Sequence, residues 1–531
     1  MIVSIFNDVI GPVMRGSSSS HCAAALRIGR LARDLMGGDI ADLLVEFDRG
    51  GSLPTTHESQ GSDMGLFGGL LGWDAADERL PGSGEALRSG GVRVRIVTVD
   101  AGDPHPNTYR LTLRGHQGHE HRMRAISTGG GMMEVIDVDG FALSMAGDYA
   151  ETLLWAAGDG KALCEMLAFQ VEADAILLHH HEGRALVEVK AQHLLGDAIL
   201  AVLRDAALVG EVRGLSAVLP VMSRRTTIVP FTTCEEMLRF DDGRGTPLWQ
   251  LAARYEAARG QLSERQLLDH MIGIVRILRR SIAEGIAGTQ YEDRVLGHQS
   301  GMFQRRMQEG RLLGDGVLNR IVLYVTAMME VKSSMGVIVA APTAGACAAL
   351  PGAVIAMAEA MGLGEEDMAK AMLASGVIGV FIATRFTFAA EVGGCQVEGG
   401  SAACMAAAAL TTLAGGTLAQ SVAAASMALQ SMIGLICDPV ANRVEVPCLG
   451  KNVMAASNAL SCANMALSDF DPVIPLDEVI ETAKRVAGQM PRELRCTSLG
   501  GLAITPTALA LQARLAQAKE TRCAKSTCGC G

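Results

Sequence analysis

Apolar residues in the first 150 positions follow two different spacings. Ala24, Ile28, Leu31 and Leu35 lie three or four residues apart, which predicts an amphipathic helix with one buried face. The runs at 42–47 and 92–99 are rich in Val, Leu and Ile and favour strands. Because the two patterns alternate, we predict an N-terminal α/β domain over residues 1–150.

Residues 151–225 follow another order, which is strand, helix, strand, strand, helix, strand. The strands are expected at 149–156, 175–181, 185–191 and 215–221, where β-type apolar runs occur between turn residues. This segment is therefore predicted to be a second domain of mixed structure.

From residue 226 to the end the pattern becomes almost wholly helical. A charged, amphipathic portion at 261–330 precedes a portion at 337–466 that is rich in Ala, Gly and Met, as expected for a central helix surrounded by others. The stretch 399–436 has no charged residue, but Ala, Gly, Ser and Thr favour a bilayer far less than Leu or Phe. We expect buried helices there, and the whole chain to be an α+β multidomain protein whose third domain, 226–531, is all-helical.

Composition and charge narrow the function classes. The chain has 531 residues, of which 49% are apolar and 4% aromatic, so its core must be built mainly from aliphatic side chains. Its net charge of −11 and the lack of a basic patch argue against nucleic-acid binding. The odd number of cysteines, 13, and a start that does not resemble a secretory signal favour reduced thiols and a cytoplasmic location, away from membranes.

Three cysteines lie in turns bounded by Gly or Pro: Cys395 in GGCQ, Cys437 in CDPV and Cys448 in VPC. Their separations do not match zinc motifs, in which paired ligands are about two to four residues apart. A cysteine taken alone is more often a small buried apolar side chain. Together, three thiolates can hold a cubane iron-sulfur cluster with one iron open to act as a Lewis acid.

Several polar residues lie in short loops that suit an anionic substrate. The serine run before His21 stands at the start of the first predicted helix, where N–H groups and hydroxyls can bind a carboxylate, although such serines also serve as plain helix caps. His21 is a candidate acid or base. Asp63 and His105 are similar candidates, with a structural role in turns as the alternative. The small-residue loops at 127–131 and 341–345 offer backbone amides to an anion.

In chain order, these segments resemble the iron-sulfur-dependent L-serine dehydratase family, with its β and α parts fused in one chain. The resemblance covers nearly the whole sequence. It is carried most strongly by DVIGPVMRGSSSSHCAAALRIGR, FDRGGSLPTTHESQGSD, HPNTYRL, STGGGMMEV, AAPTAGACAALPG, EVGGCQVEGGSA, GLICDPVANRVEVPCLGKNVMAASNA and GGLAITPT.

The resemblance implies a 4Fe-4S cluster held by Cys395, Cys437 and Cys448, and no use of pyridoxal phosphate. It implies loss of water from L-serine or a related 2-amino-3-hydroxy acid, giving a 2-oxo acid and ammonia. Residues 151–225 resemble the family's ACT-like, ferredoxin-type regulatory domain, where an amino-acid effector is expected, and the likeness favours a homodimer. The implied site consists of catalytic His21, Gln60, Asp63 and His105, and of substrate-binding Ser18, Ser19, Ser20, Ser127, Gly129, Gly130, Lys332, Thr343, Ala344, Gly345 and Arg385.

The chain departs from the family pattern at several of these positions. Gln60 stands where the family has a histidine, and glutamine cannot shuttle a proton near pH 7. Cys22 replaces a threonine and Cys496 an acidic residue. Lys332 and Arg385 add positive charge, which favours a substrate with a further anionic group. The alternatives are therefore a member acting on a larger, more acidic or cyclic amino acid or on L-cysteine, and a non-catalytic iron-sulfur sensor of an amino acid.

The C-terminal tail suggests one more hypothesis. Some members of the family place a cysteine of the tail on the open iron at rest, and Cys528 or Cys530 would serve here. A frayed terminus without such a role is the alternative.

Overall fold

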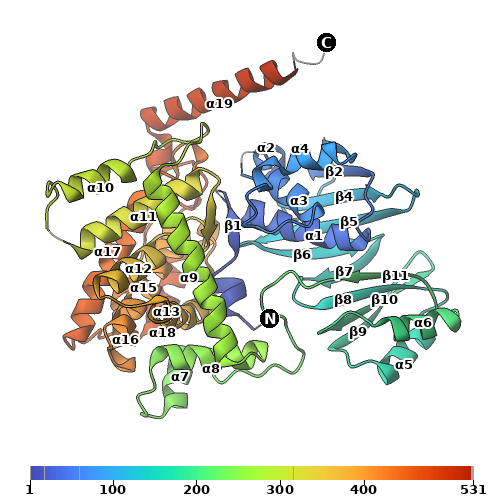
Figure 1. The fold of residues 1–531 in the computed structure, drawn as a ribbon, viewed down its shortest axis with the longest axis horizontal. Helices are drawn as coiled ribbons and strands as arrows, with labels where there is room; N and C mark the ends of the chain where they lie inside the picture. Colours follow the sequence, from blue (N-terminus) through green and yellow to red (C-terminus); the bar gives the residue numbers. More distant parts are fainter. Residues whose placement is uncertain (1, 17, 59, 315, 528–531) are drawn as a thin grey trace. The chain divides into compact units, whose positions relative to one another are not determined.

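The computed structural model describes residues 2–16, 18–58, 60–314 and 316–527. By its internal contacts the chain divides into two compact units, one formed by 18–228 and one by 1–17 together with 229–531 (Figure 1). Helices and strands both occur in quantity, so the predicted α+β class is confirmed. The finer division at residues 150 and 225 stays a prediction.

A six-stranded sheet forms the first half of the unit 18–228. Its strands lie in the order β3-β2-β4-β5-β6-β7, and only the pair β2–β3 is parallel. The bounds are Asp42–Asp48 for β2, Arg93–Val99 for β3, Thr108–Arg114 for β4, Glu120–Gly129 for β5, Met132–Val138 for β6 and Phe141–Met145 for β7. The strands predicted at 42–47 and 92–99 are confirmed.

The predicted first helix is α1 (Ala24–Leu35), and its apolar stripe is buried in the core of this sheet. It packs closely against α3 (Ser62–Leu70) because glycines line the contact. A Cβ atom on Gly69 would lie 2.1 Å from the carbonyl oxygen of Leu26, and one on Gly65 would lie 2.2 Å from that of Cys22. Glycine at both positions therefore lets the two backbones meet.

The second half of this unit has the order β8-α5-β9-β10-α6-β11 and a four-stranded antiparallel sheet with strand order β11-β8-β10-β9. The elements are β8 (Ala150–Ala156), α5 (Lys161–Gln170), β9 (Ala175–His181), β10 (Arg184–Ala191), α6 (Asp197–Asp205) and β11 (Val209–Leu215). The predicted last strand at 215–221 is wrong. Gly210 and Gly214 weaken the apolar pattern of the real strand, while Leu219 and Val221 are buried beyond it in a segment without regular structure.

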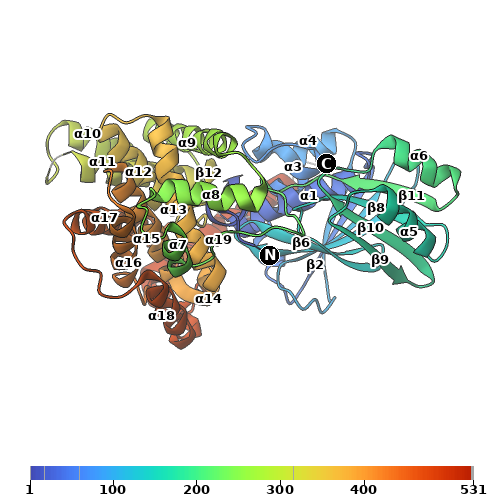
Figure 2. The same cartoon turned by 90° about the horizontal axis from the view of Figure 1, so that it is seen from below.

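The two faces of the four-stranded sheet have different partners. Leu154 and Val187 share a core with Leu163 of α5 and Leu203 of α6. Figure 2 shows these two helices beside the sheet. Leu153, Leu186 and Leu215 join the core of the six-stranded sheet. This shared core explains why residues 18–228 form one compact unit.

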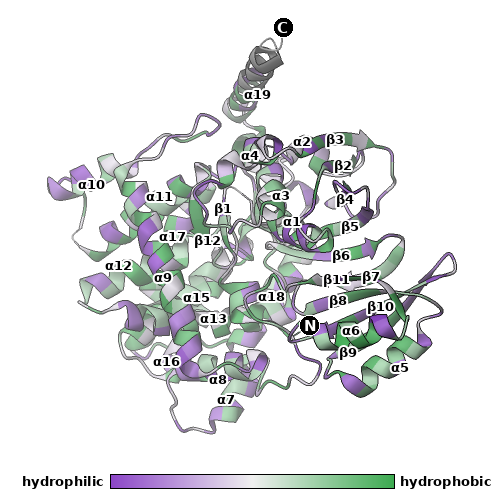
Figure 3. Cartoon of the chain, turned by 45° about the vertical axis from the view of Figure 1, so that its right-hand side comes forward, coloured by the Kyte–Doolittle hydropathy of each residue, from purple (hydrophilic) through white to green (hydrophobic). Residues whose placement is uncertain are grey.

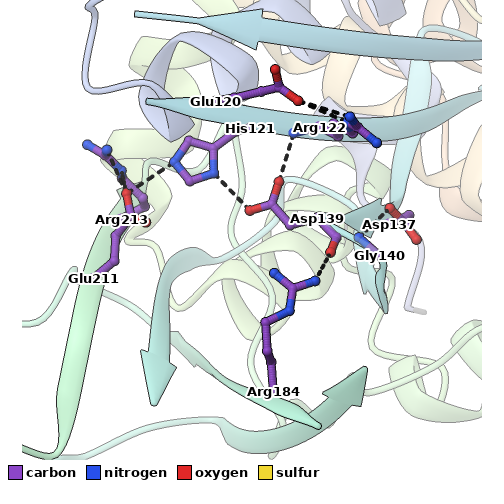
Figure 4. Close-up of polar contacts among 9 residues, drawn as sticks. All are labelled: Glu120, His121, Arg122, Asp137, Asp139, Gly140, Arg184, Glu211 and Arg213. Carbon is purple, nitrogen blue, oxygen red and sulfur yellow. Dashed lines mark hydrogen bonds and ion pairs between the residues drawn. The ribbon is translucent and has the colours of Figure 1, made fainter. Parts of the chain in front are cut away.

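A buried histidine joins the two sheets of this unit (Figure 4). His121 of β5 contacts Asp139 through Nδ1 at 2.8 Å and Glu211 of β11 through Nε2 at 3.1 Å. Burial acts to lower the pKa of His121, but the hydrogen bond and charge of Asp139 and the charge of Glu211 outweigh both burial and nearby Arg213, so the pKa is raised. The contact with Asp139 stays within the six-stranded sheet, whereas the contact with Glu211 links it to the four-stranded sheet, and both are charge-assisted when the ring is protonated.

We expect the stability of this unit to depend on His121 and on pH. A histidine whose pKa is raised by folding stabilises fully below its unfolded value of about 6.5 and loses that effect as pH rises through its folded pKa. His121→Gln should therefore cost about 1.5–3 kcal/mol at pH 6 and progressively less above it. Urea unfolding from pH 6 to 9 measures this. The matched control is exposed His180→Gln on β9, and an equal pH dependence in wild type and His121→Gln would contradict the assignment.

The unit that contains residues 1–17 and 229–531 is mainly helical. Residues 1–17 join it through a turn at Ile5–Val9 and through β1 (Val13–Arg15), which pairs with β12 (Val337–Val339). Glu256 accepts a hydrogen bond from the N–H of Ile5 at 2.8 Å. The longer helices are α7 (Cys234–Asp241), α8 (Leu248–Gly260), α9 (Glu264–Ala287), α10 (Ser300–Gln308), α11 (Val317–Ser333), α12 (Ala349–Ala360), α13 (Glu365–Arg385), α15 (Gly399–Leu413), α16 (Leu418–Gln430), α17 (Cys448–Leu467), α18 (Leu476–Gln489) and α19 (Pro506–Thr527).

Helix α15 lies at the centre of this unit and contacts α12, α13, α16 and α17. Figure 3 shows α13 and α15 in shades of green, in contrast to the largely hydrophilic α10. The uncharged stretch 399–436 forms α15 and α16, whose residues are mostly buried, so the prediction of buried helices is confirmed. Among the described helices, α13 alone has the length and apolar composition of a membrane span, and 78% of its apolar window is buried inside the protein.

Candidate functional site

The three predicted cysteine ligands converge in the helical unit. Cys395 lies in a 3-10 turn (Gly394–Gln396), Cys437 follows α16, and Cys448 is the first residue of α17. All three are buried, with at most 5% of each residue exposed. At the start of a long helix, the Cys448 thiolate also gains from the positive end of the helix dipole.

The sulfur atoms lie close together. The thiol of Cys437 is within hydrogen-bonding distance of the thiols of Cys395 and Cys496, and these two neighbours together with burial raise its pKa. Burial and the nearby Cys395 also raise the pKa of Cys448. The ligand atoms of Cys395, Cys437 and Glu398 lie within 4.8 Å of one another. Packed thiolates of this kind need a cation between them, so the donor set fits a bound metal group.

Hydrogen bonds fix the turns that carry the cysteines. Gly394 has a positive φ, and a Cβ atom there would lie 2.9 Å from the carbonyl oxygen of Leu435, so only glycine brings the Cys395 turn this close to the segment before Cys437. The buried amide of Gln396 accepts from Gly434 N–H at 2.9 Å and donates to the Ala483 carbonyl at 3.2 Å. Gly394 and Gln396 of the GGCQ motif therefore hold the turn of Cys395 in place, the first by its close approach to Leu435 and the second by its hydrogen bonds.

Helix α17 is tied to the 341–345 loop by one side chain. The amide nitrogen of Asn452 donates to the carbonyls of Gly345 at 2.8 Å and Cys448 at 2.9 Å, and its oxygen accepts from the N–H groups of Ala348 and Ala349 at 3.3 and 3.1 Å. Asn452 thereby connects the cysteine at the helix start with the loop predicted to bind a carboxylate.

A lysine and two carboxylates complete the surroundings of the thiols. Lys451 Nζ lies 3.6 Å from the Cys395 sulfur and donates to Asp438 at 2.8 Å. Burial acts to lower the pKa of Lys451, but the charges of Cys395 and Asp438 outweigh it and raise the pKa. Glu398 accepts from the Thr343 hydroxyl at 2.7 Å, and burial raises the pKa of Glu398 to about 7.

The predicted carboxylate loop lies at this site. Thr343 and Ala344 are buried, with 7% and 4% of their surface exposed. A Cβ atom on Gly345 would lie 2.7 Å from Glu398 Oε1, so a side chain there would displace that carboxylate. The structure thus brings Thr343, Ala344 and Gly345 together with Glu398 and the three cysteines.

Lys332 and Arg385, the two positively charged residues that depart from the family pattern, lie in different parts of the helical unit. Lys332 of α11 is fully buried, donates from Nζ to the Val444 carbonyl, and has its pKa lowered by burial. Arg385, at the end of α13, lies 3.7 Å from Asp477 and 3.6 Å from Glu481 of α18. Arg385 is therefore held by acidic groups of a neighbouring helix, and the expectation of a more acidic substrate stays a prediction.

The other predicted residues lie in the unit 18–228, where hydrogen bonds connect them. His21, in the π-helical turn Ser19–Ala23, contacts Ser18 Oγ through Nδ1 and Thr56 Oγ1 through Nε2, both at 3.0 Å. Thr56 donates its proton to the Ser52 carbonyl at 2.7 Å, and the hydroxyl of Ser52 donates to the Asn107 side chain. Burial lowers the pKa of His21 to about 4, so the ring is neutral at pH 7.

His105 and the 127–131 loop are linked to the same network through Asn107. The N–H of Asn107 donates to His105 Nδ1 at 3.2 Å, and its carbonyl accepts from Ser127 N–H at 3.1 Å. Gly129 and Gly130 have positive φ and turn β5 into β6, and a Cβ atom on either would meet open space. Of the serine run, Ser19 is buried and Ser20 belongs to the same turn as His21, while Ser17 is outside the described residues.

A histidine that the sequence analysis did not single out pairs with Asp63. His57, which follows α2 (Leu53–Thr56), contacts both Asp63 oxygens through Nδ1 at 2.8 and 2.9 Å. About a fifth of each side chain is exposed, 23% and 21%. Gln60 lies in the turn between them, with its N–H bonded to the Thr56 carbonyl at 2.9 Å. The chain therefore keeps a histidine beside the position where the family pattern has one.

The comparisons with known proteins agree with this geometry. Residues 243–503 match the family model described as serine dehydratase alpha chain. The chain is 37% identical to the probable L-serine dehydratase alpha chain of Bacillus subtilis over 47% of its own length and 82% of that protein. The chain belongs to the L-serine dehydratase family.

Both parts of the family are present in order. The probable L-serine dehydratase beta chain of Bacillus subtilis is 39% identical over 28% of this chain and 67% of its own length. The L-serine dehydratase of Streptomyces coelicolor is 29% identical over 95% of this chain and 99% of its own length. The recognised fusion of β and α parts is thereby confirmed.

Four residues that surround the family's cysteines were missed by the sequence analysis: Glu398, Asp438, Lys451 and Asn452. All four lie within four residues of a predicted ligand, and that proximity was the available signal. For His57 the available signal was its place in the short THESQGSD segment, three residues before Gln60 and six before Asp63. The tail residues Cys528 and Cys530 lie outside the described residues, so the tail hypothesis stays a prediction.

Proposed function

We propose that the protein is an iron-sulfur-dependent lyase that eliminates water from L-serine, giving pyruvate and ammonia. The observation that carries this proposal is the convergence of Cys395, Cys437 and Cys448 in a chain whose relatives are named L-serine dehydratase. The reducing environment that such thiols need favours the cytoplasm.

Cys395, Cys437 and Cys448 would hold a 4Fe-4S cluster. Such a cluster, when bound through three thiolates, supplies a Lewis-acidic iron that makes a hydroxyl a better leaving group. Lys451 balances thiolate charge beside Cys395, and Gln396 and Asn452 keep the ligand turns in place. These neighbours matter because residues around a metal site orient its ligands.

The 341–345 loop is proposed to bind the substrate carboxylate. Its polar hydroxyl at Thr343 and its small residues give an anion access to backbone N–H groups. In the unit 18–228, hydrogen bonds to the substrate are likewise proposed for Ser127, Gly129 and Gly130 and for Ser18, Ser19 and Ser20. Lys332 and Arg385 remain proposed substrate contacts from the sequence pattern.

His57 is proposed as the group that takes the α-proton. Its pairing with Asp63 through Nδ1 fixes the ring and leaves Nε2 as the nitrogen that exchanges a proton, the same division of roles as in histidine–carboxylate pairs of hydrolases. Gln60 can orient the substrate by hydrogen bonds but cannot move a proton. His21 and His105, linked through Thr56 and Asn107, are proposed to position the loop that carries His57.

Residues 151–225 are proposed to be an ACT-like regulatory domain. The order β8-α5-β9-β10-α6-β11 and the strand order β11-β8-β10-β9 support this, because they form the split βαβ arrangement of ferredoxin-like domains. A groove of about 940 Å³ runs beside it, lined by Arg122, Arg184, Asp137 and Glu182 among others. Charged groups of both signs suit an amino-acid effector. A homodimer stays a prediction.

A substrate panel tests the proposed reaction. We expect protein reconstituted without oxygen to release ammonia and a 2-oxo acid from L-serine faster than from L-threonine, L-cysteine or an acidic hydroxy amino acid. Preference for one of the others would contradict the substrate assignment and point to Lys332 or Arg385. Binding of an amino acid without release of ammonia or sulfide would contradict the lyase and favour a sensor.

A further inference from the structure

A fourth cysteine lies at the proposed cluster site. The thiol of Cys496 is within hydrogen-bonding distance of the Cys437 thiol, and Cys496 packs against the group formed by Ala390, Cys395 and Cys437. It is partly exposed, whereas the other three thiols are buried. Four thiols therefore lie together at this site, one for each iron of a four-iron cluster.

Backbone hydrogen bonds place Cys496 beside Cys437. Cys437 N–H donates to the Leu494 carbonyl at 2.8 Å, and Cys496 N–H donates to the Cys437 carbonyl at 2.9 Å, so the two segments form a short parallel bridge. The following residues are anchored to the same region, since Leu502 N–H donates to Asp438 at 2.9 Å. The closeness of the two thiols is thus fixed by the main chain on both sides of Cys496.

The conformation of Cys496 is unusual for its residue type. Its φ of +60° lies in the left-handed region, which non-glycine residues adopt only when their surroundings require it. Ser498, two residues on, has a φ of +56° and donates from its hydroxyl to Asn442 at 3.0 Å. The loop therefore has two residues in the left-handed region, Cys496 and Ser498. The conformation of the first directs the Cys496 side chain toward Cys437.

We propose that Cys496 is the fourth thiolate of the cluster in the resting protein and that it holds the corner that Cys395, Cys437 and Cys448 leave open. The inference rests on the proposed function, because it needs the cluster to be present. Its partial exposure and its position in a loop, compared with Cys448 on a long helix, make Cys496 the ligand that can leave when substrate arrives. The bond between the Cys496 sulfur and iron would break as a substrate oxygen replaces it, and the released thiolate would take up a proton from water, so no oxidation or reduction is involved.

Resistance to iron loss tests this proposal. A cluster with one iron free of protein ligands loses that iron under mild oxidation and becomes a paramagnetic three-iron cluster, whereas four thiolates retain all four irons. Wild type, Cys496→Ala, Cys496→Ser and a Cys528→Ala/Cys530→Ala double variant are reconstituted without oxygen and treated with one equivalent of ferricyanide. The EPR signal of the three-iron cluster and the released iron are followed with time. Cys164→Ala, in α5, is the matched control.

We expect Cys496→Ala to form the three-iron signal about tenfold faster than wild type or more, as for loss of a metal-site contact. The tail double variant and Cys164→Ala should behave as wild type. A serine oxygen can also bind iron, but less well than a thiolate, so Cys496→Ser should lose iron at a rate between those of wild type and Cys496→Ala. Equal rates in wild type and Cys496→Ala would overturn the proposal. Absence of cluster absorbance in wild type would instead contradict the proposed function itself.

Discussion

Replacing Cys437 by alanine is expected to abolish both the cluster and ammonia release. Cys437 is 2% exposed and lies within hydrogen-bonding distance of the thiols of Cys395 and Cys496, so its loss removes the thiol that both neighbours contact. Loss of a Lewis acid removes several kcal/mol of transition-state stabilisation, which corresponds to at least about a thousandfold in rate. Iron and sulfide content, visible absorbance and ammonia release from one anaerobic preparation measure the effect.

The matched control for this change is Cys404→Ala. Cys404 is fully buried in α15 of the same helical unit and is not one of the converging thiols. We expect Cys404→Ala to keep its cluster and its activity apart from a modest loss of stability. A Cys437→Ala protein with full iron content and full activity would refute the assignment of the cluster ligands.

Replacing His57 by asparagine is expected to lower kcat for L-serine by about 10²–10⁴-fold, the usual contribution of a general acid or base. Asparagine is close to histidine in polarity and can still hydrogen-bond Asp63, but it cannot carry a proton at neutral pH. The cluster absorbance should be unchanged, because the change removes no thiol and His57 is hydrogen-bonded to Asp63. The measurement is kcat and KM as a function of pH, with the cluster content of each sample.

Two further variants define the role of His57. Exposed His180→Asn, in β9, should leave kcat unchanged. Gln60→Ala should raise KM more than it lowers kcat if Gln60 orients the substrate. A His57→Asn enzyme with wild-type kcat and an unaltered pH profile would show that another group takes the proton.

The sequence predicted that Cys395, Cys437 and Cys448 lie close together, because their local chemistry is distinctive. Glycine and proline around Cys395, Cys437 and Cys448 mark turns, and turns can aim a side chain at a shared centre. The same reasoning drew attention to Thr343 to Gly345, which lie beside Glu398, while their role in binding substrate stays a prediction.

Contacts between segments that are distant in the sequence could not be predicted from local patterns of residues. The Cys496–Cys437 neighbourhood depends on a single parallel bridge, and the link from Asn452 to Gly345 joins residues more than a hundred positions apart. Residues 1–17 are attached to the helical unit by the pairing of β1 with β12. The spacing of apolar residues within either segment does not predict this pairing. The last strand of the four-stranded sheet, β11, was predicted at the wrong residues for a local reason. Gly210 and Gly214 interrupt the apolar residues by which a strand is recognised.

The dependence of the reaction on the cluster is measured as ammonia release from L-serine by one anaerobic preparation in three states: with its cluster, after removal of iron by a chelator, and after reassembly with iron and sulfide. Activity is expected to disappear with the visible absorbance and to return with it. Undiminished ammonia release by the cluster-free protein would contradict iron-sulfur-dependent catalysis.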